Sequence, residues 1–169
     1  FCSAHKNTAC ASYLDNQSPF LDKYPHVRNA VPLTRITKLK EQDPETWDYR
    51  SNFMTQNYIF PCNFIQVMTD HVYIHTVIPT GPDSCVFKCV MLIPEPALTE
   101  KAQKYWQANY DVVRNVFDED FEIGEGIQKG FATDVNTNFI FGRFEAGLQL
   151  AQKALDDALK GRLTVPKMR

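Results

Sequence analysis

The spacing of apolar residues changes near residue 99, and this change constrains the fold more than any other feature of the chain. Before it, apolar and β-branched residues alternate in short segments such as 71–78, which is the period of a β-strand. After it, apolar residues recur every three or four positions, as in an amphipathic helix. Short turn-forming segments separate the strands, so the order predicts an antiparallel meander followed by helices, the α+β class.

Four segments are expected to form the strands, at 33–39, 57–68, 71–78 and 84–93. Pro61 interrupts the second of them and predicts an edge strand or a bulge, because proline cannot donate to a sheet ladder. In the third, His71 and His75 share one face but lie about 13 Å apart along the strand, too far to bind one metal. We expect these two histidines at the surface or lining a pocket.

Two helices are expected after the strands. The first begins behind Thr99, a good N-cap residue, and continues through 119–131, although Gly124 and Gly126 weaken its helical propensity. The second runs over about 142–160 and carries an apolar stripe. The simplest architecture is a curved antiparallel sheet wrapped around this long C-terminal helix, with a cavity for a small apolar ligand between them.

Composition limits the classes of protein that fit. A chain of 169 residues is expected to form a single domain, and its net charge of -2 argues against a broad nucleic-acid-binding surface. No apolar run is long enough to span a membrane. The five cysteines are odd in number and lack the C-x-x-C spacing of zinc sites, which favours reduced thiols in a cytoplasmic protein.

An acidic segment at 118–125 contains five carboxylates. Most of them are expected on a solvated helix face, and three of them, starting at Asp118, fall at i, i+4 and i+7 on one side. Asp120 falls elsewhere, close to the line of Phe117, which is the inward side of this helix. A carboxylate that faces inward must be paired or bound to a metal, because burying it unpaired is costly.

Other catalytic signatures are missing from the sequence. There is no glycine-rich phosphate loop, no G-x-S-x-G elbow and no H-E-x-x-H pair. His5 stands among small and polar residues, and taken alone it would be interpreted as structural.

Four short segments, in order, resemble one enzyme family. They are Ala-His-Lys-Asn-Thr at 4–8, similar to the second half of a His-x4-His helix; Phe-Pro-Cys-Asn at 60–63, similar to a Phe-Pro-Asn strand; Glu-Asp-Phe and the residues that follow at 119–131, similar to a segment that supplies a carboxylate ligand; and Phe-Gly-Arg-Phe-Glu at 141–145, similar to the start of a last helix. Together they resemble the catalytic domain of Rieske-type non-haem iron oxygenases, the aromatic-ring-hydroxylating α subunits.

The resemblance implies a helix-grip fold and a specific site. His5 and Asp120 would be the catalytic metal ligands, two of the three that hold a mononuclear Fe(II), with positions left open for dioxygen. The family's other histidine would lie immediately before Phe1. We therefore expect 1–169 to be a single catalytic-type domain truncated at its N-terminus, without the upstream Rieske domain.

The resemblance also implies partners. Electrons would come from a Rieske 2Fe–2S cluster in the missing domain, supplied by a ferredoxin or a reductase, and the subunits would form a homotrimer. O2 and a small organic substrate would meet in a pocket whose walls we expect from 64–68, 71–91, the helix near Phe117 and Phe121, and 141–148. The substrate, mono- or dioxygenation and the presence of a β subunit are not predicted by the sequence.

One alternative belongs to another functional class. The same helix-grip architecture serves carriers that bind an apolar small molecule without chemistry. A carrier needs no iron, so replacing His5 or Asp120 by alanine would change little in it.

Overall fold

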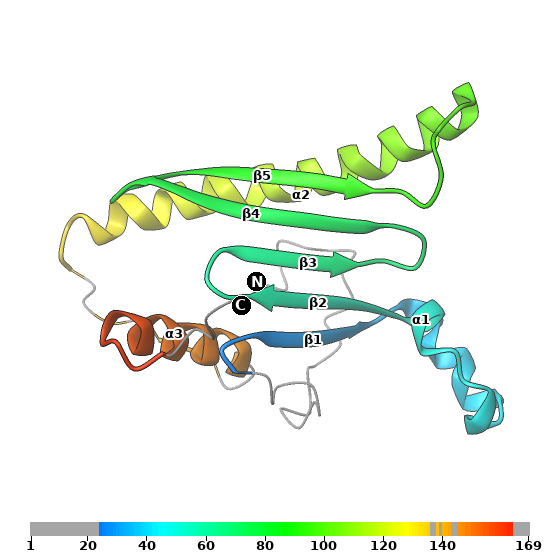
Figure 1. Cartoon of the computed structure of the whole chain (residues 1–169), viewed down its shortest axis with the longest axis horizontal. Helices are drawn as coiled ribbons and strands as arrows, with labels where there is room; N and C mark the ends of the chain where they lie inside the picture. Colours follow the sequence, from blue (N-terminus) through cyan, green and yellow to red (C-terminus); the bar gives the residue numbers. More distant parts are fainter. Residues whose placement is uncertain (1–23, 136–137, 139, 143–144, 164–169) are drawn as a thin grey trace, which may run out of the picture.

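A five-stranded antiparallel sheet followed by a long helix forms the body of the molecule (Figure 1). The computed structural model describes residues 24–135, 138, 140–142 and 145–163. Its strands are β1 (Val27–Pro32), β2 (Phe53–Ile59), β3 (Asn63–Val67), β4 (Val72–Gly81) and β5 (Ser84–Leu92). Its helices are α1 (Tyr49–Asn52), α2 (Glu100–Phe131) and α3 (Ala146–Leu159), with 3-10 helices at Thr34–Glu41 and Pro44–Thr46.

The strands pair in sequence order, β1-β2-β3-β4-β5, and every pair is antiparallel. This meander, with helices after it, confirms the α+β class and the helix-grip arrangement. The longest helix is the 32-residue α2, which crosses behind β4 and β5 (Figure 1). The C-terminal helix α3 has 14 residues and packs at β1. The helix comes close to the strand at Gly147, where a side chain would begin only 3.4 Å from Val27 Cγ1.

Strand alternation places an aromatic face of the sheet toward the helices. Tyr73 and His75 of β4 are each only 1% exposed and His71 is 7% exposed, so the two histidines are buried rather than at the surface. The register aligns His75 with Cys89 of β5, which faces the same way. Aromatic rings on this face of the sheet fill the space between the sheet and α2. The two imidazoles lie among these rings and are therefore buried with them.

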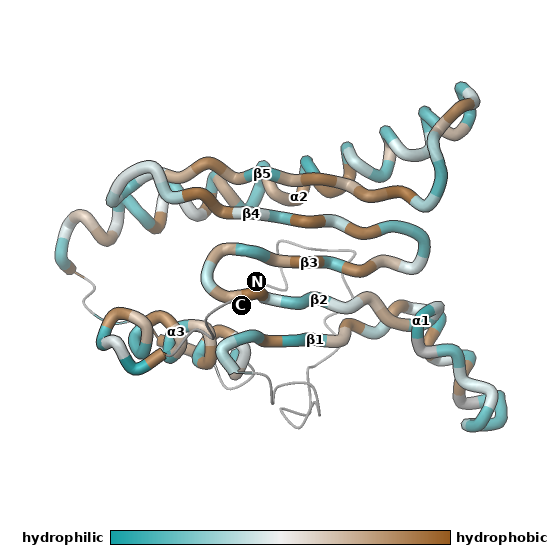
Figure 2. Tube along the Cα trace, viewed as in Figure 1, coloured by the Kyte–Doolittle hydropathy of each residue, from teal (hydrophilic) through white to brown (hydrophobic). Residues whose placement is uncertain are grey.

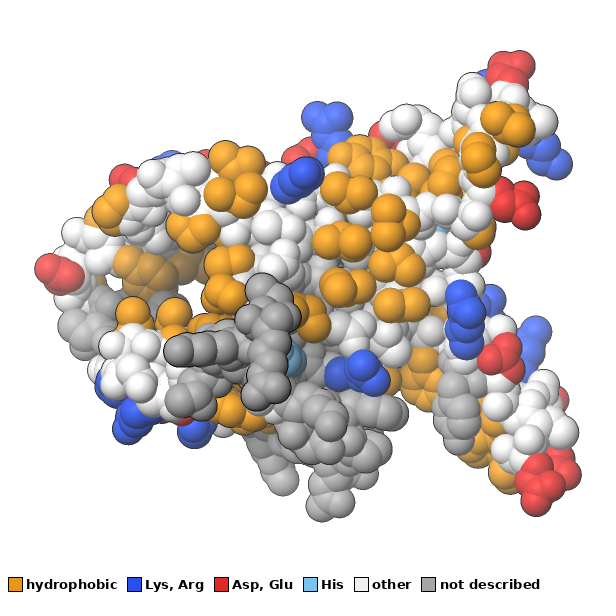
Figure 3. Space-filling view, in the orientation of Figure 1, with side chains coloured by type: hydrophobic (Ala, Val, Ile, Leu, Met, Phe, Trp, Pro, Cys, Tyr) orange, Lys and Arg blue, Asp and Glu red, His pale blue; other side chains and the backbone are white. Residues whose placement is uncertain are grey.

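The opposite face of the sheet carries aliphatic side chains. Figure 2 shows apolar residues along β3, β4 and β5, and Figure 3 shows hydrophobic side chains gathered over these strands on the face turned away from α2. Those that are exposed include Ile78, Val86, Val90 and Leu92. No helix within the described part of the chain combines the length and apolarity needed to cross a membrane.

The prediction of a strand at 33–39 was wrong, because this segment forms a 3-10 helix. The strand, β1, lies before it in the chain. Leu33, Ile36 and Leu39 recur at a spacing of three, which is the period of a 3-10 helix and puts them on one side. The Ile36 N–H donates to the Leu33 carbonyl at 2.9 Å, and Leu39 is buried at 5% exposure. The spacing of three was the signal that the strand interpretation overlooked.

The segment 57–68 forms two strands rather than one strand with a bulge. β2 and β3 pair as a hairpin in which Ile59 faces Asn63, and Pro61 lies in the turn, where the ladder needs no N–H from it. The Tyr58 hydroxyl donates to the Pro61 carbonyl at 2.6 Å across this turn.

The expected N-cap of α2 is confirmed, since Thr99 Oγ1 accepts a hydrogen bond from the Ala102 N–H at 3.2 Å. Replacing Thr99 by alanine should lower the free energy of unfolding by about 1 kcal/mol, because the first turn then loses a partner for an N–H. Thr99→Ser keeps the oxygen and should stay near wild type. Urea denaturation of the three proteins measures both values, and equal stability of the alanine and serine variants would contradict the cap.

Candidate functional site

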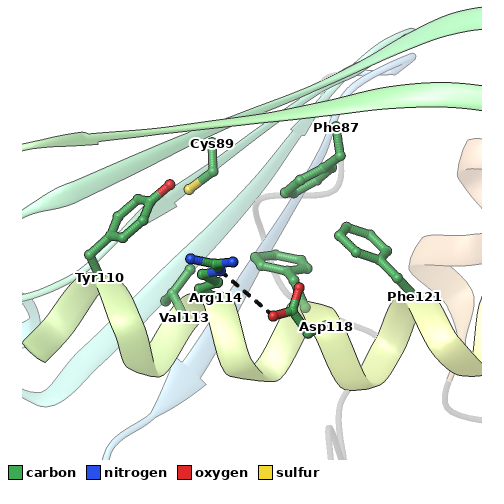
Figure 4. Close-up of a pocket in the computed structure, with 8 residues that line it drawn as sticks. Phe87, Cys89, Tyr110, Val113, Arg114, Asp118 and Phe121 are labelled. Atoms are coloured by element: carbon green, nitrogen blue, oxygen red, sulfur yellow. Dashed lines mark ion pairs between the residues drawn. The ribbon is translucent and has the colours of Figure 1, made fainter.

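A pocket of about 220 Å³ lies between β5 and α2 (Figure 4). Two of its residues come from β5, and the others lie on successive turns of α2 at helical spacing, so they share one side of that helix. The full lining is Phe87, Cys89, Tyr110, Val113, Arg114, Phe117, Asp118 and Phe121.

Three phenylalanines form the apolar part of the pocket. The ring centroids of Phe87 and Phe117 are 4.7 Å apart, those of Phe87 and Phe121 are 5.0 Å apart, and those of Phe117 and Phe121 are 5.7 Å apart. These are the separations at which aromatic rings attract one another. A planar ring of a ligand would find partners of the same kind here.

The other end of the pocket is polar. Arg114 Nε lies 3.7 Å from Asp118 Oδ2, and both side chains are mostly exposed, so this ion pair contributes less than about 1 kcal/mol to stability. The Tyr110 hydroxyl points toward Cys89 Sγ (Figure 4). Burial raises the pKa of the Cys89 thiol, which therefore stays uncharged at neutral pH. The two charges at the rim offset each other, so the pocket favours neither anions nor cations.

A buried imidazole lies directly behind the apolar part. The ring of His75 contacts Phe87 at a centroid distance of 5.4 Å and Phe117 at 4.9 Å, and it also contacts Phe64 and Tyr73. Neither of its ring nitrogens has a hydrogen-bond partner within the part of the chain that the structure describes. Burial lowers the pKa of His75 to about 4, so the ring is neutral at neutral pH.

Hydrogen bonds from β4 and the turn before it hold α2 in place. The Tyr73 hydroxyl donates to the Asn109 carbonyl at 3.0 Å. Asp70 lies 2.7 Å from His71 Nδ1 and accepts the Tyr105 hydroxyl at 2.7 Å. Burial raises the pKa of Asp70, but the hydrogen bonds from Tyr105 and His71 outweigh burial and the net shift is downward. These contacts fix the helix wall of the pocket against the sheet.

Asp120 lies on α2 but is not among the residues that line the pocket. It comes three residues after Phe117 and one before Phe121, both of which line the pocket. Of the five carboxylates in 118–125, Asp120 is half-buried and the other four are exposed.

The second expected ligand, His5, lies outside the described residues. Within the described ranges, no three His, Cys, Asp or Glu side chains come together in a group that could hold a metal ion. The pocket residues expected from 64–68 and 141–148 are not in its lining, whereas Phe117 and Phe121 are.

Comparison with known proteins identifies the family. Residues 12–161 match the family described as "Ring hydroxylating alpha subunit (catalytic domain)", which covers most of the chain. No curated protein and no solved structure matches the chain significantly. The match and the helix-grip architecture agree, and the chain therefore belongs to the ring-hydroxylating α-subunit family, a family of oxygenases, as its catalytic domain.

Proposed function

We propose that this domain binds a small aromatic or other organic substrate and hydroxylates it with O2 at a mononuclear Fe(II). The family match over 12–161 supports an oxygenase role. The observation that carries the proposal further is the half-buried carboxylate of Asp120, which lies in the sequence of α2 between two phenylalanines that line the pocket.

In this proposal His5 and Asp120 hold the iron together with the histidine that the family pattern places immediately before Phe1. Fe(II) bound by two imidazoles and one carboxylate supplies the activation of O2, which no amino-acid side chain provides. A Rieske 2Fe–2S cluster outside these residues, a ferredoxin or reductase, a homotrimeric assembly and a cytoplasmic location belong to the same proposal.

The pocket residues would bind and orient the substrate. Phe87, Phe117 and Phe121 offer ring faces and edges to an aromatic ring and exclude water from it. Asp120 belongs to the same helix as Phe117 and Phe121, so the helix that would supply the metal ligand also carries part of the ring-binding surface. The residues of α2 thus determine which part of the substrate faces the metal ligand.

Iron content tests the proposal on protein expressed from the complete open reading frame that contains this chain. We expect about one mononuclear iron per chain, in addition to any cluster iron, and its loss in Asp120→Ala and His5→Ala, because a facial triad binds weakly without one ligand. Iron quantification and the anomalous X-ray signal at the iron edge measure it.

Glu119→Ala is the matched control, because it removes an exposed carboxylate next to Asp120 on the same helix and should leave the iron in place. If wild type contains no mononuclear iron, the oxygenase proposal fails and the domain is better explained as a carrier of an apolar small molecule.

A further inference from the structure

His75 is a buried polar side chain without a visible purpose in the fold. It is 1% exposed, and both ring nitrogens lack hydrogen-bond partners within the described residues. Buried polar groups are nearly always paired, because an unpaired one costs stability that an apolar ring of the same size would not. The neighbouring His71 differs, since its Nδ1 lies 2.7 Å from the Asp70 carboxylate.

The position of His75 relates it to the pocket. Phe87 and Phe117 line the pocket and also contact the imidazole ring, so His75 lies one layer of side chains behind the pocket surface. A ligand ring would reach the imidazole only by displacing one of these two phenylalanines. The other rings in contact with it, Phe64 and Tyr73, come from the strands beneath.

We propose that His75 is a specificity-determining residue, which forms a hydrogen bond with a hydroxyl group on an uncharged aromatic substrate. This inference rests on the proposed function, because it takes the pocket between β5 and α2 as the substrate site. The neutral imidazole offers one N–H donor and one acceptor nitrogen, and a ring hydroxyl can use either.

The surroundings of His75 select the charge of the substituent. Within the described residues, its ring contacts are with Phe64, Tyr73, Phe87 and Phe117, and none of these rings carries a charge at neutral pH. A carboxylate or ammonium group brought to this layer would be desolvated without an opposite charge, which is costly. A hydroxyl loses much less on leaving water and regains a hydrogen bond from the imidazole.

Two probes of equal size test the proposal, phenol and toluene, which differ by a hydroxyl in place of a methyl group. Their dissociation constants are measured by calorimetry with wild type, His75→Phe and the control Leu98→Ala, all from the complete open reading frame. We expect the ratio of the toluene constant to the phenol constant to fall by roughly five- to tenfold in His75→Phe, the value of one hydrogen bond. Leu98→Ala removes a side chain that is 86% exposed and is not in the pocket lining, and it should keep the wild-type ratio.

An unchanged ratio in His75→Phe, with both probes still bound, would overturn the role of His75 and leave the proposed oxygenase function standing. Failure of wild type to bind either ring would overturn this inference and the pocket assignment together, whereas the iron measurement tests the metal site separately. Should His75→Phe not fold, the ¹⁵N resonances of the wild-type imidazole decide instead: they should shift with phenol and not with toluene, and equal responses would overturn the proposal.

Discussion

Replacing Tyr73 by alanine is expected to lower the free energy of unfolding by about 4 kcal/mol, since truncation of a buried large aromatic residue leaves a cavity. Tyr73 is 1% exposed and is one of the two largest fully buried side chains of the described structure. Its ring lies between the rings of His71 and His75, at centroid distances of 4.7 and 5.8 Å. Its hydroxyl donates to the Asn109 carbonyl, which joins β4 to α2.

Two further variants separate the contributions. Tyr73→Phe keeps the ring and loses the hydrogen bond, so it should cost about 1 kcal/mol. Leu98→Ala removes a side chain that is 86% exposed and should change stability by less than about 0.5 kcal/mol. Urea denaturation followed by circular dichroism measures all three. If Tyr73→Ala were no less stable than Leu98→Ala, α2 would not pack on β4 as described.

Acidification is expected to destabilise the domain through His75. Its pKa is lowered to about 4 in the folded state from the ordinary value of 6.5, so between these values the unfolded chain binds the proton and the folded chain does not. Stability contributed by the neutral ring is therefore complete above pH 6.5 and is lost as the pH falls toward 4. The shift corresponds to about 3 kcal/mol over this interval.

The variant His75→Phe isolates this effect, because phenylalanine has nothing to protonate. The difference in unfolding free energy between the two proteins should grow by about 3 kcal/mol from pH 7 to pH 4 in favour of the variant. The lowered pKa of Asp70 affects stability only below about 3.8, and it affects both proteins alike. Parallel pH profiles for wild type and variant would show that His75 is not held neutral by burial.

Local signals in the sequence were sufficient where one period dominated. The strands at β4 and β5 and the cap at Thr99 follow from alternation and from side-chain chemistry within a few residues. The 3-10 helix after Pro32 and the hairpin at Pro61 were missed, because both depend on how the chain turns against neighbouring segments. Strand alternation also grouped His71 with His75, but it could not tell which face α2 covers.

The candidate site shows the same limit. Helical spacing alone placed Asp120 on the inward side of α2, and its half-buried position agrees with that placement. The β5 wall of the pocket could not be derived in the same way, because the contact of Phe87 with Phe117 joins residues thirty positions apart in the sequence. The lack of hydrogen-bond partners at the His75 ring nitrogens is a property of all the side chains around that ring. It cannot be derived from the spacing of residues in the sequence.

The division of the pocket between a strand and a helix has a consequence for how such an enzyme could change its substrate. Asp120, Phe117 and Phe121 belong to one continuous helix, so a substitution that tilts α2 would disturb the proposed iron ligand and the proposed ring-binding surface together. Phe87 and Cys89 belong to β5. Substitution of these two strand residues would therefore reshape the cavity while the proposed iron ligand stays in place. Variation at these two positions would let the domain accept other substrates without changing the residue that we propose as the metal ligand.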